Sequence, residues 1–592
     1  MKYFPALLAL LFFSGCHLFH RVPNSPPAVE RVIRSQFPEG KDEFNRTPES
    51  YEARAAHGMI SSEGVPATNI ALEVLKAGGN AVDAAVALSF AIGVYRPHST
   101  GIGGGGFLVV YDERSSKAEV LDMRERAPAR ATRDMYLDKS GEVTEKSRWG
   151  GLAVATPGLV AGLWEAFQKR GSGKVSWKQL VLPSAKLARD GFAVDPDLAE
   201  AIRWTSDKGL LERFPSAKKL LAPNGKPLQL GDIYKNPNLA KTLETIAENG
   251  KDGFYKGWVA KDILAAVKKD GGILEQRDLD SYALRYREPV KAEFGEYTIL
   301  SMPPPSSGGV HIVEMLNMAE DLIRDTDFES VANWHLKAEI MRRAFADRSK
   351  YLGDPSFFKV PVAGLTSEEY ARHLAKSIDR ARASKSVEVE PGQPAPYEKV
   401  HTTHFSIVDN NGLAVASTQT INYLFGAVLV AEESGIFLND EMDDFSAKPG
   451  APNLFGLVGG EANAIAPGKT PLSSMSPTIV TKAGKIYLVL GSPGGSKIIT
   501  SVWNVLFNVL HHKLSLRDAV FAPRMHHQWL PDKLVAEPGW EGATLQGLRE
   551  KGHDVEELKG FALGSVTAVE VEANGGKVGV ADPRRGGAAA GY

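Results

Sequence analysis

Cysteine is almost absent from the sequence, because Cys16 is the only one among 592 residues. A single thiol excludes a disulfide within the chain and a metal site built from several cysteines. The histidine pairs at 511–512 and 526–527 are sequence neighbours and lack the i, i+4 spacing of two ligands on one helix face. The sequence therefore predicts a protein without a metal site.

An excess of positive charge is also absent, because 69 Lys and Arg residues stand against 71 Asp and Glu residues. A formal net charge of −2 provides no basic surface for a phosphate backbone, so nucleic acid is not an expected partner. After the N-terminus, no apolar run approaches the roughly 18 residues of a membrane-spanning helix. Hydrophobic residues make up 43% of the chain, which is enough to form a large core.

The N-terminus has the features of an export signal. Lys2 precedes an apolar run at residues 4–13, which is too short to span a bilayer but suits a signal peptide. The run is followed by Ser-Gly-Cys16, which resembles the bacterial lipobox, in which the cysteine is lipidated and becomes the first mature residue. Phe13 departs from that pattern, where leucine is usual, so an ordinary signal peptide stays an alternative.

These features predict a signal peptide over residues 1–15 and a lipidated Cys16 that begins a flexible tether over residues 16–45. We expect an exported protein on the periplasmic face of a bacterial membrane, with the outer membrane preferred. If Cys16 is not lipidated, the expected location is the soluble periplasm.

Several helices are expected from apolar periodicity, at residues 69–76, 81–91, 155–169, 177–190 and 239–248, with one long helix at 310–351. Residues 381–400 contain three prolines without apolar periodicity, which predicts an exposed and mobile segment. The glycine run at 101–106 leads into a strand and lacks a following Lys-Ser/Thr, which favours close backbone packing over a phosphate site.

A β-hairpin is predicted next. Residues 402–409 and 413–421 have strand patterns, and an Asn-Asn-Gly turn signal lies between them. If the turn centres near Asn411, paired residue numbers sum to about 822, which places Thr420 opposite Thr402. Two threonine hydroxyls would then meet at the open end of the hairpin.

Thr402 starts a strand directly after the polar segment. Such a threonine becomes a nucleophile if the preceding peptide bond is cut, because its freed α-amino group has a pKa near about 8 and can act as the base. On its own, a Thr-Thr pair in a strand is also ordinary β-propensity. The choice between these interpretations depends on other segments.

Three later blocks combine polar side chains with turns. Several carboxylates lie at 438–446, two adjacent serines lie at 471–478, and residues 491–496 read Gly-Ser-Pro-Gly-Gly-Ser between a strand and a helix. Consecutive glycine N–H groups at a helix N-terminus form an anion-binding nest, as an oxyanion hole requires. Taken singly, the blocks are also compatible with a solvated turn, a serine cap and a plain connection.

Together these blocks resemble the gamma-glutamyltranspeptidase family, in which a Thr-Thr-His-aromatic-Ser run is followed in order by Asn-x-x-Met-Asp-Asp-Phe, Pro-Leu-Ser-Ser-Met-Ser-Pro-Thr and Gly-Ser-Pro-Gly-Gly. The resemblance implies an N-terminal nucleophile hydrolase, an α/β protein with a four-layer αββα sandwich. It also implies a proenzyme that cuts itself between His401 and Thr402. A large subunit of residues 46–401 and a small subunit of residues 402–592 would then form an intertwined heterodimer.

The resemblance further implies catalytic roles for four residues. Thr402 would be the nucleophile, and Thr420 would hydrogen-bond to it and orient it. Gly494 and Gly495 would donate their N–H groups to the oxyanion.

A γ-glutamyl donor presents a free α-carboxylate and a free α-ammonium, so its pocket needs a cation and at least one carboxylate. By the same resemblance six residues would bind these two groups: Arg124, Ser473 and Ser474 on the carboxylate side, and Asn422, Glu441 and Asp444 on the ammonium side. Some relatives have Gln in place of Glu441. The loop at 448–460 would be a lid, and Phe455 stands where bacterial relatives often have Tyr.

The implied reaction is attack of Thr402 on the γ-amide carbon of glutathione or a related compound, followed by transfer of the glutamyl group to water, an amino acid or a peptide. No cofactor is implied. Two alternatives stay open: a cephalosporin-type acylase of the same superfamily, which would not need the acids that bind an ammonium, and a non-catalytic surface lipoprotein that binds γ-glutamyl compounds or a partner protein.

Overall fold

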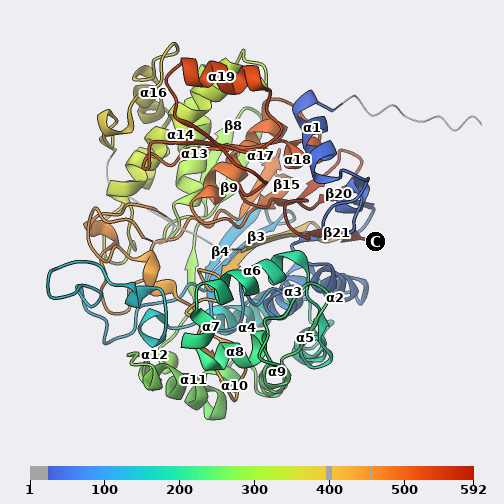
Figure 1. The fold of residues 1–592 in the computed structure, drawn as a ribbon. Helices are drawn as coiled ribbons and strands as arrows, with labels where there is room; N and C mark the ends of the chain where they lie inside the picture. The colour runs from blue at the N-terminus through green and yellow to red at the C-terminus, as the bar shows by residue number, and fades with distance from the viewer. Residues whose placement is uncertain (1–24, 395–402, 454–455) are drawn as a thin grey trace, which may run out of the picture.

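A computed structural model describes residues 25–394, 403–453 and 456–592. Two seven-stranded antiparallel sheets lie at its centre (Figure 1). The first sheet has the spatial order β1 (Glu52–Ala55), β20 (Lys577–Val580), β19 (Thr567–Val571), β15 (Lys485–Gly491), β14 (Thr478–Lys482), β9 (Tyr297–Ser301) and β8 (Val290–Phe294). The second has the order β21 (Ala588–Gly591), β2 (Met59–Ser62), β10 (Thr403–Val408), β11 (Leu413–Thr420), β3 (Gly105–Asp112), β4 (Lys117–Asp122) and β7 (Arg285–Arg287).

An apolar core joins the two sheets face to face. It includes Phe107 and Val109 from the second sheet and Ile479 and Val489 from the first, all fully buried. These residues alternate along their strands with side chains that face the helices, which is the period-2 pattern of a strand buried on both faces. The sheets therefore form the two inner layers of a sandwich.

Helices cover the outer face of each sheet (Figure 1). Over the first sheet and at its ends lie α1 (Pro27–Gln36), α13 (Gly308–Leu322), α14 (Val331–Tyr351), α15 (Val362–Leu365), α16 (Glu368–Lys376), α17 (Lys497–Leu510), α18 (Leu516–Phe521) and α19 (Gly542–Glu550). On the side of the second sheet lie α2 (Val65–Lys76), α3 (Ala81–Tyr95), α4 (Leu159–Arg170), α5 (Trp177–Asp190), α9 (Pro237–Asn249), α10 (Asp252–Tyr255), α11 (Gly257–Lys269) and α12 (Gln276–Asp280). The predicted four-layer αββα sandwich is confirmed.

Smaller elements complete the chain. A satellite cluster contains α6 (Pro196–Asp207), α7 (Leu210–Arg213) and α8 (Pro215–Leu221). Short strand pairs and one three-stranded sheet are formed by β5 (Phe192–Ala193) with β6 (Ile233–Tyr234), β12 (Val430–Ala431) with β13 (Ile436–Phe437), and β16 (Met525–His526) with β17 (Leu534–Ala536) and β18 (Val555–Glu557). Within the described ranges, no helix has both the length and the apolar character to cross a membrane.

The predicted hairpin is present with the predicted register. In β10 and β11, Thr403 pairs with Gln419 and Val408 pairs with Ala414, so paired numbers sum to 822. Both strands lie inside the second sheet, between β2 and β3 from the N-terminal part of the chain. Strands from before and after position 402 therefore share one sheet, as the intertwined arrangement requires.

The expected flexible tether is wrong for its C-terminal part. Residues 27–36 form α1, whose side chains Val29 and Val32 are fully buried against the first helical layer. Arg31 Nη2 also donates to Glu329 Oε2 at 2.9 Å. Apolar residues at i, i+3 and i+4 give this short segment one packed face. The many polar residues between them make the helical pattern difficult to recognise in the sequence.

Two further expectations need correction. The single helix at 310–351 is two helices, α13 and α14, because Asp and Thr residues favour a turn at 323–330 and Ser330 Oγ accepts from Asn333 N–H at 3.1 Å to start α14. The segment after residue 381 is not simply exposed. Ser386 is buried and its N–H donates to Asp532 at 2.8 Å, so residues 381–394 include parts that pack on the protein.

Candidate active site

The open end of the β10–β11 hairpin carries Thr420. This residue pairs with Gly105 of β3, and its Oγ1 accepts a hydrogen bond from the backbone N–H of Asn422 at 2.7 Å. A Cβ on Gly104 would lie 1.9 Å from the carbonyl oxygen of Thr420. The glycine run before β3 is therefore required by close backbone packing, as predicted.

Gly494 and Gly495 form the connection between β15 and α17. Their φ angles are +133° and +61°, in the region that favours glycine. A Cβ on Gly494 would lie 3.0 Å from Cα of Gly564, so neighbouring backbone also restricts this position. Their carbonyl groups accept the first hydrogen bonds of the helix, each at 3.2 Å, which leaves two glycine N–H groups at a helix N-terminus. This is the local geometry expected of an anion nest.

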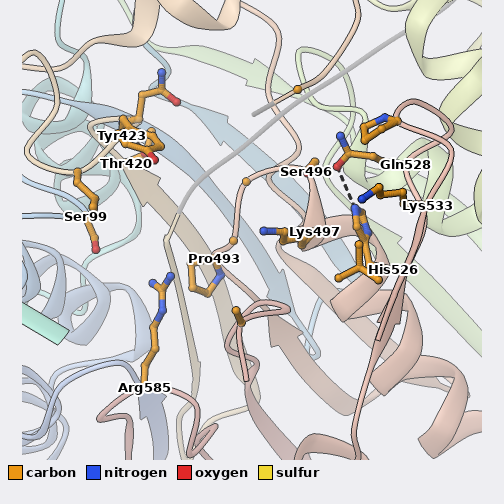
Figure 2. A pocket seen from close by; sticks show the side chains of 18 of the residues that line it. Ser99, Thr420, Tyr423, Pro493, Ser496, Lys497, His526, Gln528, Lys533 and Arg585 are labelled. Carbon is orange, nitrogen blue, oxygen red and sulfur yellow. Dashed lines mark hydrogen bonds between the residues drawn. The ribbon is translucent and has the colours of Figure 1, made fainter. Parts of the chain in front are cut away.

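A cavity of about 620 Å³ brings these two regions together, because Thr420, Asn422, Gly494 and Gly495 all line it. Figure 2 shows Thr420 across this space from Pro493, which precedes the two glycines. A volume of this size suits a small molecule. The predicted catalytic groups that the structure describes therefore face a single space.

Two histidines line the same cavity, and neither suits the role of a general base. Burial lowers the pKa of His98 well below its ordinary value, and it lowers the pKa of His526 to about 3. His526 Nε2 lies 3.0 Å from Gln528 Oε1 (Figure 2). An imidazole that stays neutral to such a low pH takes up a proton poorly, so both histidines are weak candidates for a general base.

Arg124 is the centre of a buried ion-pair cluster. It follows β4, and its guanidinium is hydrogen-bonded to Glu441 and to Asp444, whose Oδ2 accepts from Nη2 at 2.7 Å. The two acids lie in one 3₁₀ turn, Glu441–Asp444, so a single turn presents both of them to Arg124. The structure thus brings together three residues that the sequence resemblance assigned to donor binding.

Carboxyl groups outnumber the guanidinium in this cluster. Glu125 Oε2 lies 3.8 Å from Arg124 Nη1, and Asp440 lies beside Glu441. Burial raises the pKa of Asp444 and of Glu125 to about 7, although Arg124 opposes both shifts. Burial also raises the pKa of Asp440 and of Glu441 well above the ordinary range. An acid-rich, buried site of this kind attracts an ammonium group.

Several buried polar atoms of this cluster lack a hydrogen-bond partner among the described residues, among them Arg124 Nε, Asp440 Oδ2 and Asn422 Oδ1. Buried polar atoms in native proteins are nearly always satisfied, so a local group of exceptions indicates room for a polar ligand. Asn422 connects this cluster to the large cavity, because it lines the cavity and its Nδ2 donates to the Asp440 carbonyl oxygen at 3.1 Å.

The two predicted serines lie beside the same guanidinium. Ser473 and Ser474 are fully buried, and they follow Leu472, whose carbonyl oxygen accepts from Arg124 Nη2 at 3.5 Å. Arg124, Glu441 and both serines are not among the residues that line the large cavity. Asp444 instead lines a separate cavity of about 10 Å³. Of the residues predicted to bind the donor, Asn422 therefore lines the large cavity and the other five do not.

Described residues of the loop at 448–460 lie next to this cluster. Asn453 Nδ2 lies 3.5 Å from Asp444 Oδ1, and Leu457 lines the small cavity next to Asp444. Gly456 lines the large cavity. Because the loop borders both spaces, its position fits the predicted lid.

Four of the predicted site residues lie outside the described residues: Cys16, His401, Thr402 and Phe455. The first described residue after the predicted cleavage point is Thr403, whose partner Gln419 is adjacent to Thr420 in β11.

Lys497 and Arg585 line the large cavity near Pro493 (Figure 2), and sequence reasoning gave neither a role. For Lys497 a signal existed. It occupies the first turn of α17, where a positive charge interacts unfavourably with the helix dipole. Helix stability therefore does not explain a lysine at this position. Arg585 belongs to a C-terminal Asp-Pro-Arg-Arg block whose position in space could not be read from the sequence.

Known proteins are similar to this chain in sequence and in fold. The family model of gamma-glutamyltranspeptidase matches residues 67–592. A glutathione hydrolase proenzyme from Escherichia coli (strain K12) is 45% identical over 579 residues, which are 98% of this chain and 97% of that relative.

Solved structures extend the comparison. A cephalosporin acylase from Bacillus halodurans aligns with a TM-score of 0.81 at 27% identity, over 91% of this chain and 97% of that chain. A Helicobacter pylori gamma-glutamyltranspeptidase aligns with a TM-score of 0.54 at 39% identity, over 56% of this chain and 94% of that chain. The glycine nest, the buried arginine–acid cluster and these similarities agree, and the chain belongs to the gamma-glutamyltranspeptidase family.

Proposed function

We propose that the chain is a self-processing γ-glutamyltransferase and glutathione hydrolase with Thr402 as its nucleophile. The observation that carries the proposal is the buried contact of Arg124 with Glu441 and Asp444, because a γ-glutamyl donor has the two charges that such a cluster recognises. Support also comes from the E. coli relative, which is named a glutathione hydrolase proenzyme.

The first reaction is the cut before Thr402. The Thr402 hydroxyl oxygen attacks the carbonyl carbon of His401, the hydroxyl proton passes to the amide nitrogen, and the carbon–nitrogen bond breaks to leave an ester. Breakage of that bond frees the amine of Thr402, and water then hydrolyses the ester, which frees the carboxylate of His401 and the hydroxyl of Thr402. The products are a large subunit that ends at His401 and a small subunit of residues 402–592.

In the second reaction the freed amine of Thr402 takes the proton from the threonine hydroxyl, which attacks the γ-amide carbon of glutathione. Gly494 and Gly495 donate N–H groups to the oxyanion, and Thr420 orients the nucleophile. The amine of the leaving dipeptide takes up the proton as the amide bond breaks. The glutamyl ester of Thr402 then reacts with water, an amino acid or a peptide.

Donor selection rests on the cluster around Arg124. Arg124 binds the α-carboxylate together with Ser473 and Ser474, and its unpartnered Nε–H provides an additional donor. Asp444, Glu441 and Asn422 bind the α-ammonium, for which Asn422 Oδ1 is a free acceptor among the described residues. A donor would replace part of the present contact between Arg124 and the acids.

Export and anchoring complete the proposal. The signal peptide at 1–15 directs the protein to the periplasm, and lipidation of Cys16 holds it on the membrane face. Because α1 packs on the core from residue 27, the tether is the short stretch before that helix and does not extend to residue 45.

The acylase alternative has one observation in its favour, which is the TM-score of 0.81 to the Bacillus halodurans enzyme. An acylase without an ammonium site would have no use for the acids around Arg124. Denaturing electrophoresis combined with turnover of glutathione and of a glutaryl amide tests these functions. Two subunits that hydrolyse glutathione support the proposal, two subunits that prefer the glutaryl amide support the acylase, and one inactive chain supports a binding protein.

A further inference from the structure

Arg348 is a buried cation that the mechanism above does not use. It lies near the end of α14 with 2% of its surface exposed, and its Nε–H donates to Ser307 Oγ at 3.3 Å. Among the described residues, no carboxylate forms an ion pair with its guanidinium. The other buried arginines of this helix, Arg342 and Arg343, both pair with Glu339. A buried guanidinium without a carboxylate partner is costly, so its presence requires a reason.

The first reason lies on the ammonium side of the donor site. Arg348 and Asp444 line the same cavity of about 10 Å³, together with Asn453 and Leu457 from the lid loop. A space of that size holds about one water molecule, so the two charges are near each other without direct contact. The negative charge of Asp444 acts on Arg348, whose pKa burial lowers to about 10.

The second reason lies on the carboxylate side. Ser307, which accepts the hydrogen bond from Arg348, donates through both its N–H and its Oγ to the carbonyl oxygen of Ser473, each at 3.2 Å. Arg348 therefore fixes the orientation of a hydroxyl that holds the backbone of Ser473. One side chain thus reaches both halves of the donor site.

We propose that Arg348 is a positioning residue for donor binding, which holds Ser473 in place through Ser307 and keeps Asp444 ionised to receive the α-ammonium. The inference rests on the proposed function, because it assigns Arg348 to the same donor site. It extends that function to a residue on the helical layer that does not line the large cavity.

The charges that face Asp444 determine the expected effect. The cations are Arg124 and Arg348, and the carboxyl groups are those of Glu125, Asp440, Glu441 and Asp443. Without Arg348, only Arg124 opposes four acids and the effect of burial. The pKa of Asp444, which burial already raises to about 7, then rises further, and the ionised fraction near neutral pH falls.

The test is a pH series of KM and kcat for glutathione with Arg348→Gln, Arg348→Lys and Ser307→Ala. Arg343→Gln is the matched control, because it removes a buried arginine from the same helix that does not share a cavity with Asp444. Only enzyme that is fully cleaved into its two subunits is compared. A defect in folding or processing is then not mistaken for a defect in donor binding.

For Arg348→Gln we expect KM near pH 7 to rise about tenfold, kcat to change less than about twofold, and the pH midpoint of KM to move up by about one unit. Arg348→Lys should restore the midpoint. Ser307→Ala should raise KM about threefold without moving the midpoint, because it leaves both charges in place. The control should keep the wild-type profile.

An Arg348→Gln enzyme with the wild-type midpoint would overturn the role through Asp444, and an Arg343→Gln enzyme with the same shift would reduce Arg348 to a structural residue. If Arg348→Gln is not recovered as a processed enzyme, Ser307→Ala decides, and a wild-type KM for that variant overturns the proposal. A wild-type enzyme that does not turn over glutathione would instead contradict the proposed function.

Discussion

Arg124 donates a hydrogen bond at 2.7 Å to Asp444, which lies 320 residues later in the chain and beyond the proposed cleavage point. The ion pair therefore joins the two proposed subunits. It also joins the two proposed binding functions, because the guanidinium proposed for the α-carboxylate contacts the acid proposed for the α-ammonium. We expect the contact to survive cleavage, since strands from both parts of the chain alternate in the two central sheets.

Replacement of Arg124 by lysine should raise KM for glutathione steeply. A planar guanidinium can bind a carboxylate through two N–H groups while an ammonium is a point charge, and the loss amounts to about 1.5 to 3 kcal/mol. Steady-state kinetics at fixed pH measures this change. Arg130→Lys, at an exposed arginine nearby, is the control. An unchanged KM for Arg124→Lys would indicate that this residue has a structural role and that the donor binds elsewhere.

The pH dependence of donor binding should follow Asp444. Burial raises its pKa to about 7, so the group is mostly protonated below that pH and ionised above it. Only the ionised form pairs with an α-ammonium, and kcat/KM for glutathione should therefore rise as the pH increases from about 6 to 8. A donor without the α-amino group provides the comparison. If its kcat/KM shows the same rise, another group is responsible.

Phe455→Tyr should lower the ratio of hydrolysis to transfer. A tyrosine hydroxyl at this lid position could bond to Asn422, whose Oδ1 is buried and lacks a partner among the described residues. Such a hydrogen bond is worth about 0.5 to 1.5 kcal/mol and would keep the lid closed against water. The ratio is measured with glutathione and a dipeptide acceptor, with Phe357→Tyr on an exposed loop as the control. An unchanged ratio would show that the lid does not control whether the glutamyl group is transferred to water or to the acceptor.

Cys16→Ser should release the protein from membranes into the soluble exported fraction. An acyl chain on Cys16 is the only anchor that the sequence indicates, and its loss should also abolish labelling by a fatty-acid probe. Ser14→Ala keeps a small residue in the lipobox and should stay membrane-bound. Membrane association that persists in Cys16→Ser would favour an uncleaved signal peptide as the anchor.

Local sequence signals were sufficient for the hairpin. An Asn-Asn-Gly turn fixes the register of two alternating strands, so the pairing that brings Gln419 opposite Thr403 could be derived from residue numbers alone. The motifs also identified Arg124 and Asp444, which the structure brings into contact. Both results depend on patterns that are short and specific.

Other features depend on contacts that are distant in sequence. The helix α1 has only a short apolar face, and its packing requires Glu329 and the first helical layer, which come far later in the chain. Arg348 lies in a helix of mostly buried residues, where a charged side chain carries no local sign of its partner. The cations Lys497 and Arg585 likewise share one cavity only after the chain has folded.

Intact-mass spectrometry of the purified wild type, Thr402→Ala and Thr403→Ala tests the central claim most directly. The account predicts that the wild type and Thr403→Ala each contain a small subunit of 191 residues that begins at position 402, with glutathione hydrolysis in both. Thr402→Ala should remain one uncut, inactive chain, because both the cut and the turnover need its hydroxyl. An uncut wild type with full turnover, or a Thr402→Ala variant that is cut and active, would contradict the account.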